Sequence, residues 1–173
     1  MGGDRSEMTV KVSRYTLPKF KIGIKPDKPF YLAGETLRAR VETRYFFGKP
    51  VERARVRVVL FRRDGAAIGS TITGTADAAG VYELSTELPE SLARAGRPEQ
   101  VFLEVAVEDA AGQKERKQSA VTVTRELLDL DVIPAGGRVV AEMENTFFVL
   151  STTPDGKPVG ARVTVQLPDG EER

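Results

Sequence analysis

The tetrapeptide Gly-Lys-Pro-Val at 48–51, followed by Ala-Arg-Val-Arg-Val at 54–58, decides the fold of this chain. The same tetrapeptide recurs at 156–159 and leads into Ala-Arg-Val-Thr-Val at 161–165. The second copy is offset from the first by 108 residues, from position 48 to position 156. A turn followed by an alternating strand, repeated after about a hundred residues, indicates two consecutive copies of one β-sandwich module.

Apolar and polar residues alternate along most of the sequence around the first copy. Leu37, Ala39 and Val41, for example, alternate with charged residues, which is typical of a strand with one buried and one wet face. The expected strands of the first module are 19–25, 37–45, 54–60, 70–75, 81–84, 101–107 and 119–124. Residues 30–35 are expected to turn the chain, and 89–95 to make one helical turn at most. About seven strands predict an all-β, immunoglobulin- or fibronectin-III-like antiparallel sandwich.

The repeat also predicts how the chain is divided. Residues 1–16 are expected to hold a tail and, at 8–15, the last strand of a preceding module. Residues 17–124 then form a complete sandwich, and 125–173 form the beginning of a second one, with about three strands. Three strands do not bury both inner faces of a sandwich, so this part is expected to expose apolar surface. The chain is therefore interpreted as a piece of a longer protein.

The connection between the two modules is short. It spans residues 124–126 and contains neither glycine nor proline. Since a hinge between domains is usually richer in these residues, the sequence predicts tight coupling of the two modules.

The sequence contains no histidine and no cysteine. Their absence excludes Ser-His and Cys-His nucleophilic catalysis, zinc sites of the usual ligand types and disulfide frameworks. Hydrolysis by carboxylates alone needs two acids that face each other in a cleft, and no spacing here indicates such a pair. We therefore expect no enzyme activity, no catalytic residue, no cofactor and no metal site.

The net charge is +1, but basic and acidic residues are distributed unevenly along the chain. Residues 1–63 hold 16 Lys and Arg against 6 Asp and Glu, so the remainder holds 10 against 19. The basic half fits an anionic partner, or else its charges are compensated by neighbouring strands. We favour compensation and expect no nucleic-acid partner, because the basic residues alternate along strands without exposed aromatic residues between them. The absence of a long apolar run and of a signal peptide predicts no membrane contact by this segment.

Several short segments of the sequence resemble those of a known protein family. They lie at 15–22, 25–26, 29–35 and 45–51 in the first module and at 133–137, 144–146 and 154–159 in the second. In order and spacing they resemble the macroglobulin-like modules of the alpha-2-macroglobulin and complement-component superfamily. The first module resembles the third module of such proteins and the second the beginning of the fourth, with bacterial members nearest.

The resemblance implies a structural scaffold role in a bacterial protease-trapping inhibitor. Partners would be neighbouring macroglobulin-like modules of the parent chain and, through the full-length protein, proteases, in the periplasm or outside the cell. The family's reactive Cys-Gly-Glu-Gln and its bait segment are absent here, so no functional residue is carried over. A stand-alone immunoglobulin-like adhesive or binding module is the alternative, and the unfinished second copy favours the scaffold.

Three aromatic residues are the candidate inter-module contact: Tyr45, Phe46 and Phe47. Strand alternation sends at least one of these rings inward, so an exposed role falls mainly to Phe46.

Two other groups of polar residues admit a ligand-binding interpretation. Lys49 and Lys157 stand in the Gly-Lys-Pro loops, where they would suit an anion, but turn formation explains the motif more simply. The acids Asp64, Asp77, Asp109 and Asp155 precede glycine or alanine in loops. They suit turns better than calcium, because they lack the spacing of a calcium loop.

Overall fold

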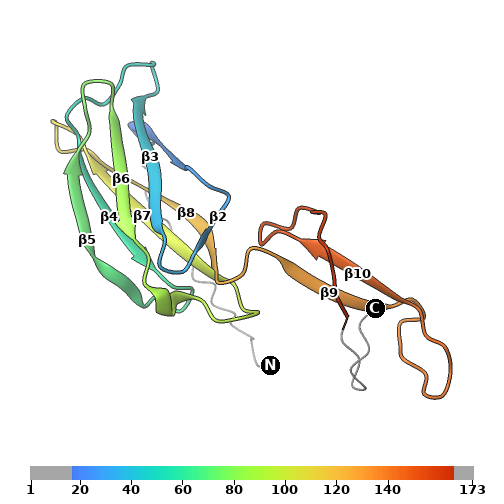
Figure 1. Cartoon of the computed structure of the whole chain (residues 1–173). Helices are drawn as coiled ribbons and strands as arrows, with labels where there is room; N and C mark the ends of the chain where they lie inside the picture. The colour runs from blue at the N-terminus through green and yellow to red at the C-terminus, as the bar shows by residue number, and fades with distance from the viewer. Residues whose placement is uncertain (1–16, 166–173) are drawn as a thin grey trace, which may run out of the picture.

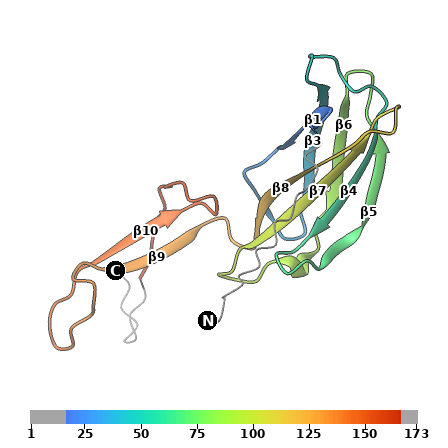
Figure 2. The same cartoon turned by 180° about the vertical axis from the view of Figure 1, so that it is seen from behind.

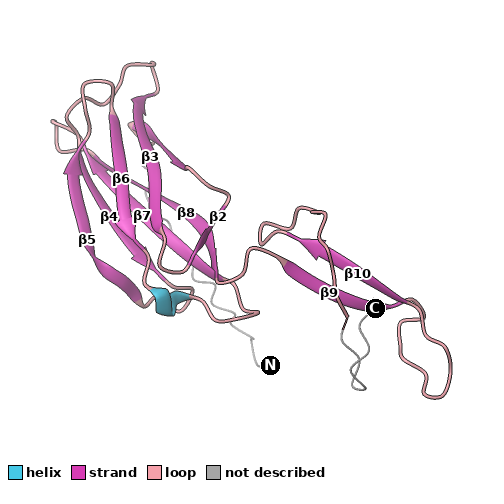
Figure 3. Cartoon of the chain, in the orientation of Figure 1, coloured by secondary structure: helices cyan, strands magenta, loops and turns pink. Residues whose placement is uncertain are grey.

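The computed structural model describes residues 17–165, so the strand expected at 8–15 lies outside the described residues. Strands make up nearly all of the regular structure, and one short 3-10 turn, η1 (Glu90–Leu92), precedes β7 (Figures 1 and 3). The strands are β1 (Phe20–Pro26), β2 (Phe30–Leu32), β3 (Thr36–Tyr45), β4 (Arg55–Phe61), β5 (Ala67–Thr75), β6 (Val81–Glu87), β7 (Glu99–Glu108), β8 (Lys114–Thr124), β9 (Asp129–Pro134) and β10 (Phe147–Thr152).

The first module is a β-sandwich of two sheets. One sheet has the strand order β1-β3-β6 and the other has β2-β8-β7-β4-β5, which Figure 2 shows from behind. All pairs are antiparallel except β2 with β8. A separate two-stranded sheet, β9 with β10, follows along the chain. The expected all-β sandwich is thus confirmed.

The core lies between the two sheets and follows the alternation in the sequence. On β3, Leu37, Ala39, Val41 and Thr43 are buried, whereas the arginines between them are exposed. The inward residues of β4 and of β7 are buried in the same way. Full burial of a Val or Leu side chain stabilises the fold by about 1.5–3 kcal/mol, so these alternating faces supply most of the driving force for folding.

Residues 30–35 do more than turn the chain. Residues 30–32 form β2, which pairs in parallel with β8 and so joins the five-stranded sheet. Tyr31 is fully buried, and its hydroxyl lies within hydrogen-bond distance of the Asp27 carboxylate and of the Arg38 carbonyl oxygen, the latter at 2.8 Å. Because Arg38 belongs to β3, Tyr31 ties the two sheets together at one edge. A three-residue parallel strand has no sequence signal of its own, and the prediction of a simple turn was incomplete.

Because of Tyr31, the stability of the module should decrease with increasing pH in the alkaline range. Burial, and after it the Asp27 carboxylate, raise the pKa of Tyr31 to about 12 from an ordinary value of 10.0. The raised pKa favours the neutral form, so its contribution is complete below pH 10 and is lost as the pH rises toward 12. Between pH 9 and 11.5 the unfolding free energy should fall by about 2 kcal/mol more in the wild type than in Tyr31→Phe. Urea denaturation checks this, and equal falls in both proteins would contradict it.

Gly80 closes the turn between β5 and β6 against the end of β3. The Thr43 amide donates to the Gly80 carbonyl oxygen at 2.8 Å, and the Thr43 hydroxyl lies 2.9 Å from the same oxygen. Gly80 has a φ of 72°, and a Cβ there would lie 2.5 Å from the Thr43 carbonyl oxygen. Both the backbone conformation and the packing therefore require glycine at this position.

Replacement of Gly80 by alanine is expected to destabilise the first module by about 2–4 kcal/mol, because left-handed strain adds to a clash with backbone atoms. Gly112 is the matched control. It has a φ of 76°, but a Cβ there would meet nothing within 4 Å. Gly112→Ala should cost only about 1 kcal/mol. Thermal or urea unfolding of the two variants measures the difference, and equal losses would show that the close approach at Gly80 is unimportant.

The second unit repeats the β1–β3 pair of the first at the offset of 108. Pro134 pairs with Phe147 as Pro26 pairs with Ala39. The connecting loop repeats as well, since the amide of residue 135 donates to the carbonyl oxygen of 146 at 2.8 Å, as 27 donates to 38 at 3.1 Å.

The Gly-Lys-Pro turns also match, hydrogen bond for hydrogen bond. The Val159 amide donates to the Ser151 carbonyl oxygen at 3.1 Å, as the Val51 amide donates to that of Thr43 at 3.1 Å. The glycines of the two turns have φ values of 96° and 82°. The sequence repeat is therefore a structural repeat, and turn formation accounts for the motif.

Burial is where the two units differ. Leu130 and Val149 are 53% and 42% exposed, whereas the residues 108 positions earlier, Ile22 and Val41, are 6% and 0% exposed. The expected exposure of apolar surface is thus observed.

The third strand expected in the second unit is not formed at 159–165, and 166–167 lie outside the described residues. In the first module the corresponding strand, β4, pairs with β5 and β7. Both partners follow β4 in the sequence. Among the described residues, the second unit has only β9 and β10, which correspond to β1 and β3 and not to β5 or β7.

Candidate inter-module surfaces

The three aromatic residues of the candidate contact form one cluster, here called the aromatic tip. Tyr45 ends β3, and the Phe47 ring stacks on it with centroids 5.1 Å apart. The Phe46 ring is not part of this stack; instead, the Lys21 ammonium group lies 5.1 Å from its centroid. Phe46 and Phe47 are 55% and 74% exposed, so two of the three rings face outward.

Tyr45 fixes the aromatic tip to the sandwich. Its ring meets that of Phe20 edge to face at 6.0 Å, and its hydroxyl donates to the Asp109 carboxylate at 2.9 Å. Burial, and then the Asp109 carboxylate, raise the pKa of Tyr45. The second oxygen of Asp109 accepts the backbone amides of Ala111 and Gln113. The exposed rings therefore stand on an ordered base.

A hollow of about 560 Å³ lies beside the aromatic tip and is here called the first hollow. It is lined by residues 18 and 20–23, by Glu42, Arg44 and Phe46, and by 115–117. Apart from Pro18 and Phe46, these residues come from β1, β3 and β8, so the hollow spans the opening between the two sheets.

The connection between the two units is held by side chains. The Arg125 guanidinium donates to the carbonyl oxygens of Ala93 at 2.8 Å and Glu90 at 3.0 Å. The carboxylate of Glu126 accepts the Gly96 amide at 3.3 Å. These bonds clamp the loop that precedes β7 to the start of the connection, and the tight coupling of the two modules stays a prediction. The sequence analysis did not single out Arg125, because its acceptors lie 32 and 35 residues away.

A second hollow, here called the junction hollow, lies where the two units meet. Its volume is about 450 Å³, and it is lined by Gly96 and Pro98 of the first module together with Glu126, 128–131 and Thr152.

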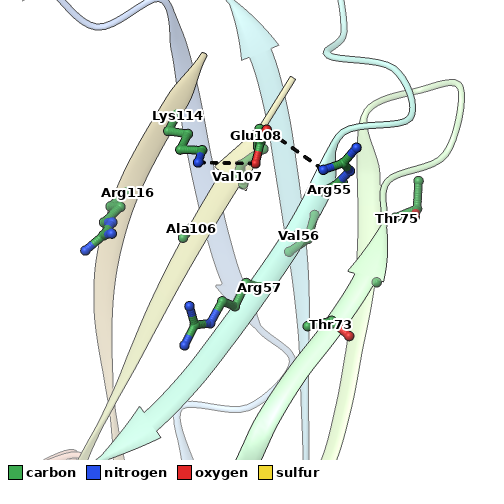
Figure 4. A pocket seen from close by; sticks show the side chains of 11 residues that line it. Arg55, Val56, Arg57, Thr73, Thr75, Ala106, Val107, Glu108, Lys114 and Arg116 are labelled. Carbon is green, nitrogen blue, oxygen red and sulfur yellow. Dashed lines mark ion pairs between the residues drawn. The ribbon is translucent and has the colours of Figure 1, made fainter. Parts of the chain in front are cut away.

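A third hollow, of about 540 Å³, lies on the five-stranded sheet (Figure 4). Its side chains come from β4, β5, β7 and β8, and they include four basic residues, Arg55, Arg57, Lys114 and Arg116. Glu108 lies between two of them, 3.9 Å from Arg55 and 3.6 Å from Lys114.

Charges from the two halves of the sequence therefore meet on common surfaces. Arg40 likewise pairs with Glu83 at 3.2 Å. These exposed ion pairs support mutual compensation of the asymmetric charge, although each contributes little to stability.

The loop acids serve as turn acceptors. Asp64 accepts the amide of Ala66, Asp77 accepts that of Ala79, and Asp109 accepts two amides in the same manner. Lys157 and the Thr153 hydroxyl lower the pKa of Asp155. Within residues 17–165 there is no group of three or more acidic, histidine or cysteine side chains that could hold a metal ion. In the same range no helix is long and apolar enough to cross a membrane.

Comparison with known proteins shows a family similarity for the first module. Residues 14–90 match the macroglobulin domain MG3. The first module is thus similar to a macroglobulin domain. It is similar in sequence to the alpha-2-macroglobulin of Thermotoga maritima, with 38% identity over 55 residues, which is 32% of this chain and 4% of the relative.

The alpha-2-macroglobulin of Ralstonia nicotianae is also similar, with 28% identity over 138 residues, which is 73% of this chain and 8% of the relative. The chain thus spans less than a tenth of the length of these curated relatives.

Solved structures give the same fold. The crystal structure of trypsin-activated alpha-2-macroglobulin from Escherichia coli matches with a TM-score of 0.59 and 11% identity over 91% of this chain and 14% of that one. Salmonella alpha-2-macroglobulin reacted with methylamine matches with a TM-score of 0.59 and 13% identity over 84% of this chain and 12% of that one. At these identities the likeness concerns the fold alone, which is that of the β-sandwich described above.

The Arg125 clamp yields a prediction for the junction between the modules. Arg125→Ala removes two charge-assisted hydrogen bonds, so amide hydrogen exchange in 90–98 should become about 10-fold faster. Arg138→Ala is the control, because this exposed arginine of the β9–β10 loop has no hydrogen bond or ion pair within the described residues. Amide hydrogen exchange of residues 90–98, measured by mass spectrometry in both variants, tests the prediction. Unchanged protection of the loop in Arg125→Ala would mean that the clamp does not hold it.

Proposed function

We propose that this chain is a scaffold segment of a bacterial alpha-2-macroglobulin-like inhibitor that traps proteases. The observation that carries the proposal is the tandem repeat of one module at an offset of 108 residues, retained down to individual hydrogen bonds. The macroglobulin match of the first copy and the similarity to bacterial alpha-2-macroglobulins support it.

The physical properties of the first module suit a scaffold. It has a dense apolar core, and side-chain hydrogen bonds hold the start of the short connection, Arg125 and Glu126, against its own loop before β7. A row of such sandwiches holds distant parts of a large protein at fixed separations until cleavage elsewhere lets the domains rearrange. In this proposal the cleavable segment and any reactive group lie in other parts of the parent protein.

The partners and the location follow from the same proposal. The segment contacts neighbouring macroglobulin modules, and proteases meet the full-length protein in the periplasm or outside the cell. The exposed apolar face of β9 and β10 favours a scaffold over a free-standing adhesive module, since a face of this kind calls for cover by further chain.

The proposal predicts that the isolated 173-residue chain neither inhibits trypsin nor incorporates methylamine. It has no cysteine from which a thioester could form, and a module of 18.9 kDa is too small to enclose a protease. Titration of trypsin against a protein substrate and uptake of labelled methylamine measure these two properties. Stoichiometric inhibition of trypsin by the isolated chain would contradict the scaffold role.

A second measurement concerns the natural polypeptide. An antibody raised against residues 17–124 should detect in the source cells a protein several times heavier than 18.9 kDa. After exposure to trypsin this protein should retain the protease through gel filtration. If the heavy protein never retains a protease, the similarity of the first module to macroglobulin domains still holds, but the trapping function is overturned.

A further inference from the structure

The first hollow and the junction hollow occupy the same place in the repeat. Six positions line both. In the first hollow they are Pro18, Phe20, Lys21, Ile22, Gly23 and Arg44. In the junction hollow they are Glu126, Leu128, Asp129, Leu130, Asp131 and Thr152. Each residue of the second set stands 108 positions after its counterpart. The two hollows are therefore one feature of the module, seen once at the start of each copy.

The junction hollow shows what lies against this feature. Gly96 and Pro98, which belong to the loop before β7 of the preceding module, form its other side. The Gly96 amide donates to the carboxylate of Glu126, one of the six repeated positions. The first hollow lacks such a loop among the described residues, since its lining comes from the first module alone.

The charges at the junction are complementary. The loop at 94–98 carries two arginines, Arg94 and Arg97. The hollow against which it lies carries three acids, Glu126, Asp129 and Asp131. Opposite charges at such a contact fix the register and disfavour wrong partners more than they add affinity.

The charge of the first hollow is reversed. Lys21 stands where the junction hollow has Asp129, and Arg44, Arg116 and Lys117 also line it, against Glu42 and Glu115. Phe46 of the aromatic tip adds an exposed apolar ring at its rim. An occupant of this hollow should therefore be acidic, with an apolar residue to cover Phe46.

We propose that the first hollow is the docking site for a loop of a β-sandwich module that precedes residue 17, the loop that corresponds to 94–98, and that this loop carries net negative charge. The occupant is inferred from the repeat and its charge from the lining residues. The inference rests on the proposed function, because it needs a parent chain with a module on the amino-terminal side. It gives Phe46, one of the three aromatic residues of the candidate contact, a defined partner.

Cysteine labelling tests the docking directly, because the chain has no cysteine of its own. A Cβ on Gly23 would lie 3.7 Å from Glu42, an ordinary contact, so Gly23→Cys places a thiol in the first hollow without strain. Arg57→Cys, at an exposed position of β4, is the control. Each variant is made in the 173-residue chain and in a chain extended by the preceding module of the parent, and maleimide labelling is timed in both.

The extension should slow labelling of Gly23→Cys by about 10-fold or more and leave Arg57→Cys unchanged, because a docked loop must open before the reagent enters. Adding Lys21→Glu to the extended Gly23→Cys chain should restore faster labelling, by about 3-fold, since it opposes an acidic loop. Adding Arg57→Glu, the matched charge reversal, to the same chain should leave the labelling rate of Gly23→Cys unchanged. Equal labelling rates of Gly23→Cys in the two chains would overturn the proposal, as would slower labelling after Lys21→Glu.

The outcomes separate the docking from the proposed function. Protection of Gly23→Cys in a parent that retains no protease would support the docking site and refute the trap. Retention of protease by a parent in which Gly23→Cys is labelled at the rate of the isolated chain would refute the docking site alone.

Discussion

The rest of this structure depends on one constraint: the apolar face of an alternating strand must be covered by a second sheet. On β3 this cover buries Leu37, Ala39 and Val41 beneath the five-stranded sheet, and the same backbone pattern leaves the arginines in water. Where the second sheet is missing, as at β9 and β10, the same alternation leaves apolar side chains exposed. The pattern in the sequence selects the strand, but only the opposing sheet turns that pattern into stability.

The two copies of the module share their backbone and differ in their surface. The Gly-Lys-Pro turn, the strand register and the connecting loop repeat at 108 residues. Lys21 of the first copy corresponds to Asp129 of the second, and Tyr45 corresponds to Thr153. Backbone hydrogen bonds thus define the module, while the side chains at its ends are free to differ with the neighbour that each copy meets. Tandem proteins separate fold from specificity in this way.

In the proposed scaffold role, the shape of the module and the placement of its contacts matter more than reactive groups. Its loop acids are used as turn acceptors and its exposed cations are partly paired across strands, so the polar groups serve the fold. The Arg125 clamp and the hollows lie at the ends of the modules, where a neighbouring module would make contact. A stiff row of modules requires contacts at the ends of each sandwich more than chemistry on its faces.

The sequence by itself determined the strands with strong alternation, the turns at Gly-Lys-Pro and at the aspartates, the repeat and the family resemblance. These follow from local rules, because period-two burial and positive-φ glycines leave their mark within a few residues. It also indicated that at least one ring of Tyr45, Phe46 and Phe47 lies inward, but it did not indicate that Phe47 is more exposed than Phe46, because β3 ends at Tyr45 and strand alternation stops there.

The tertiary structure decided what depends on residues far apart in the chain. The parallel pairing of β2, the sheet-to-sheet tie of Tyr31 and the bonds of Arg125 each join groups with no local signal. At 159–165 the expected third strand of the second unit is not formed, although the local alternation there matches that of β4, which has β5 and β7 as partners. The equivalence of the two hollows became visible only when both copies had folded, since a hollow is bounded by several elements at once and a sequence lists them one at a time.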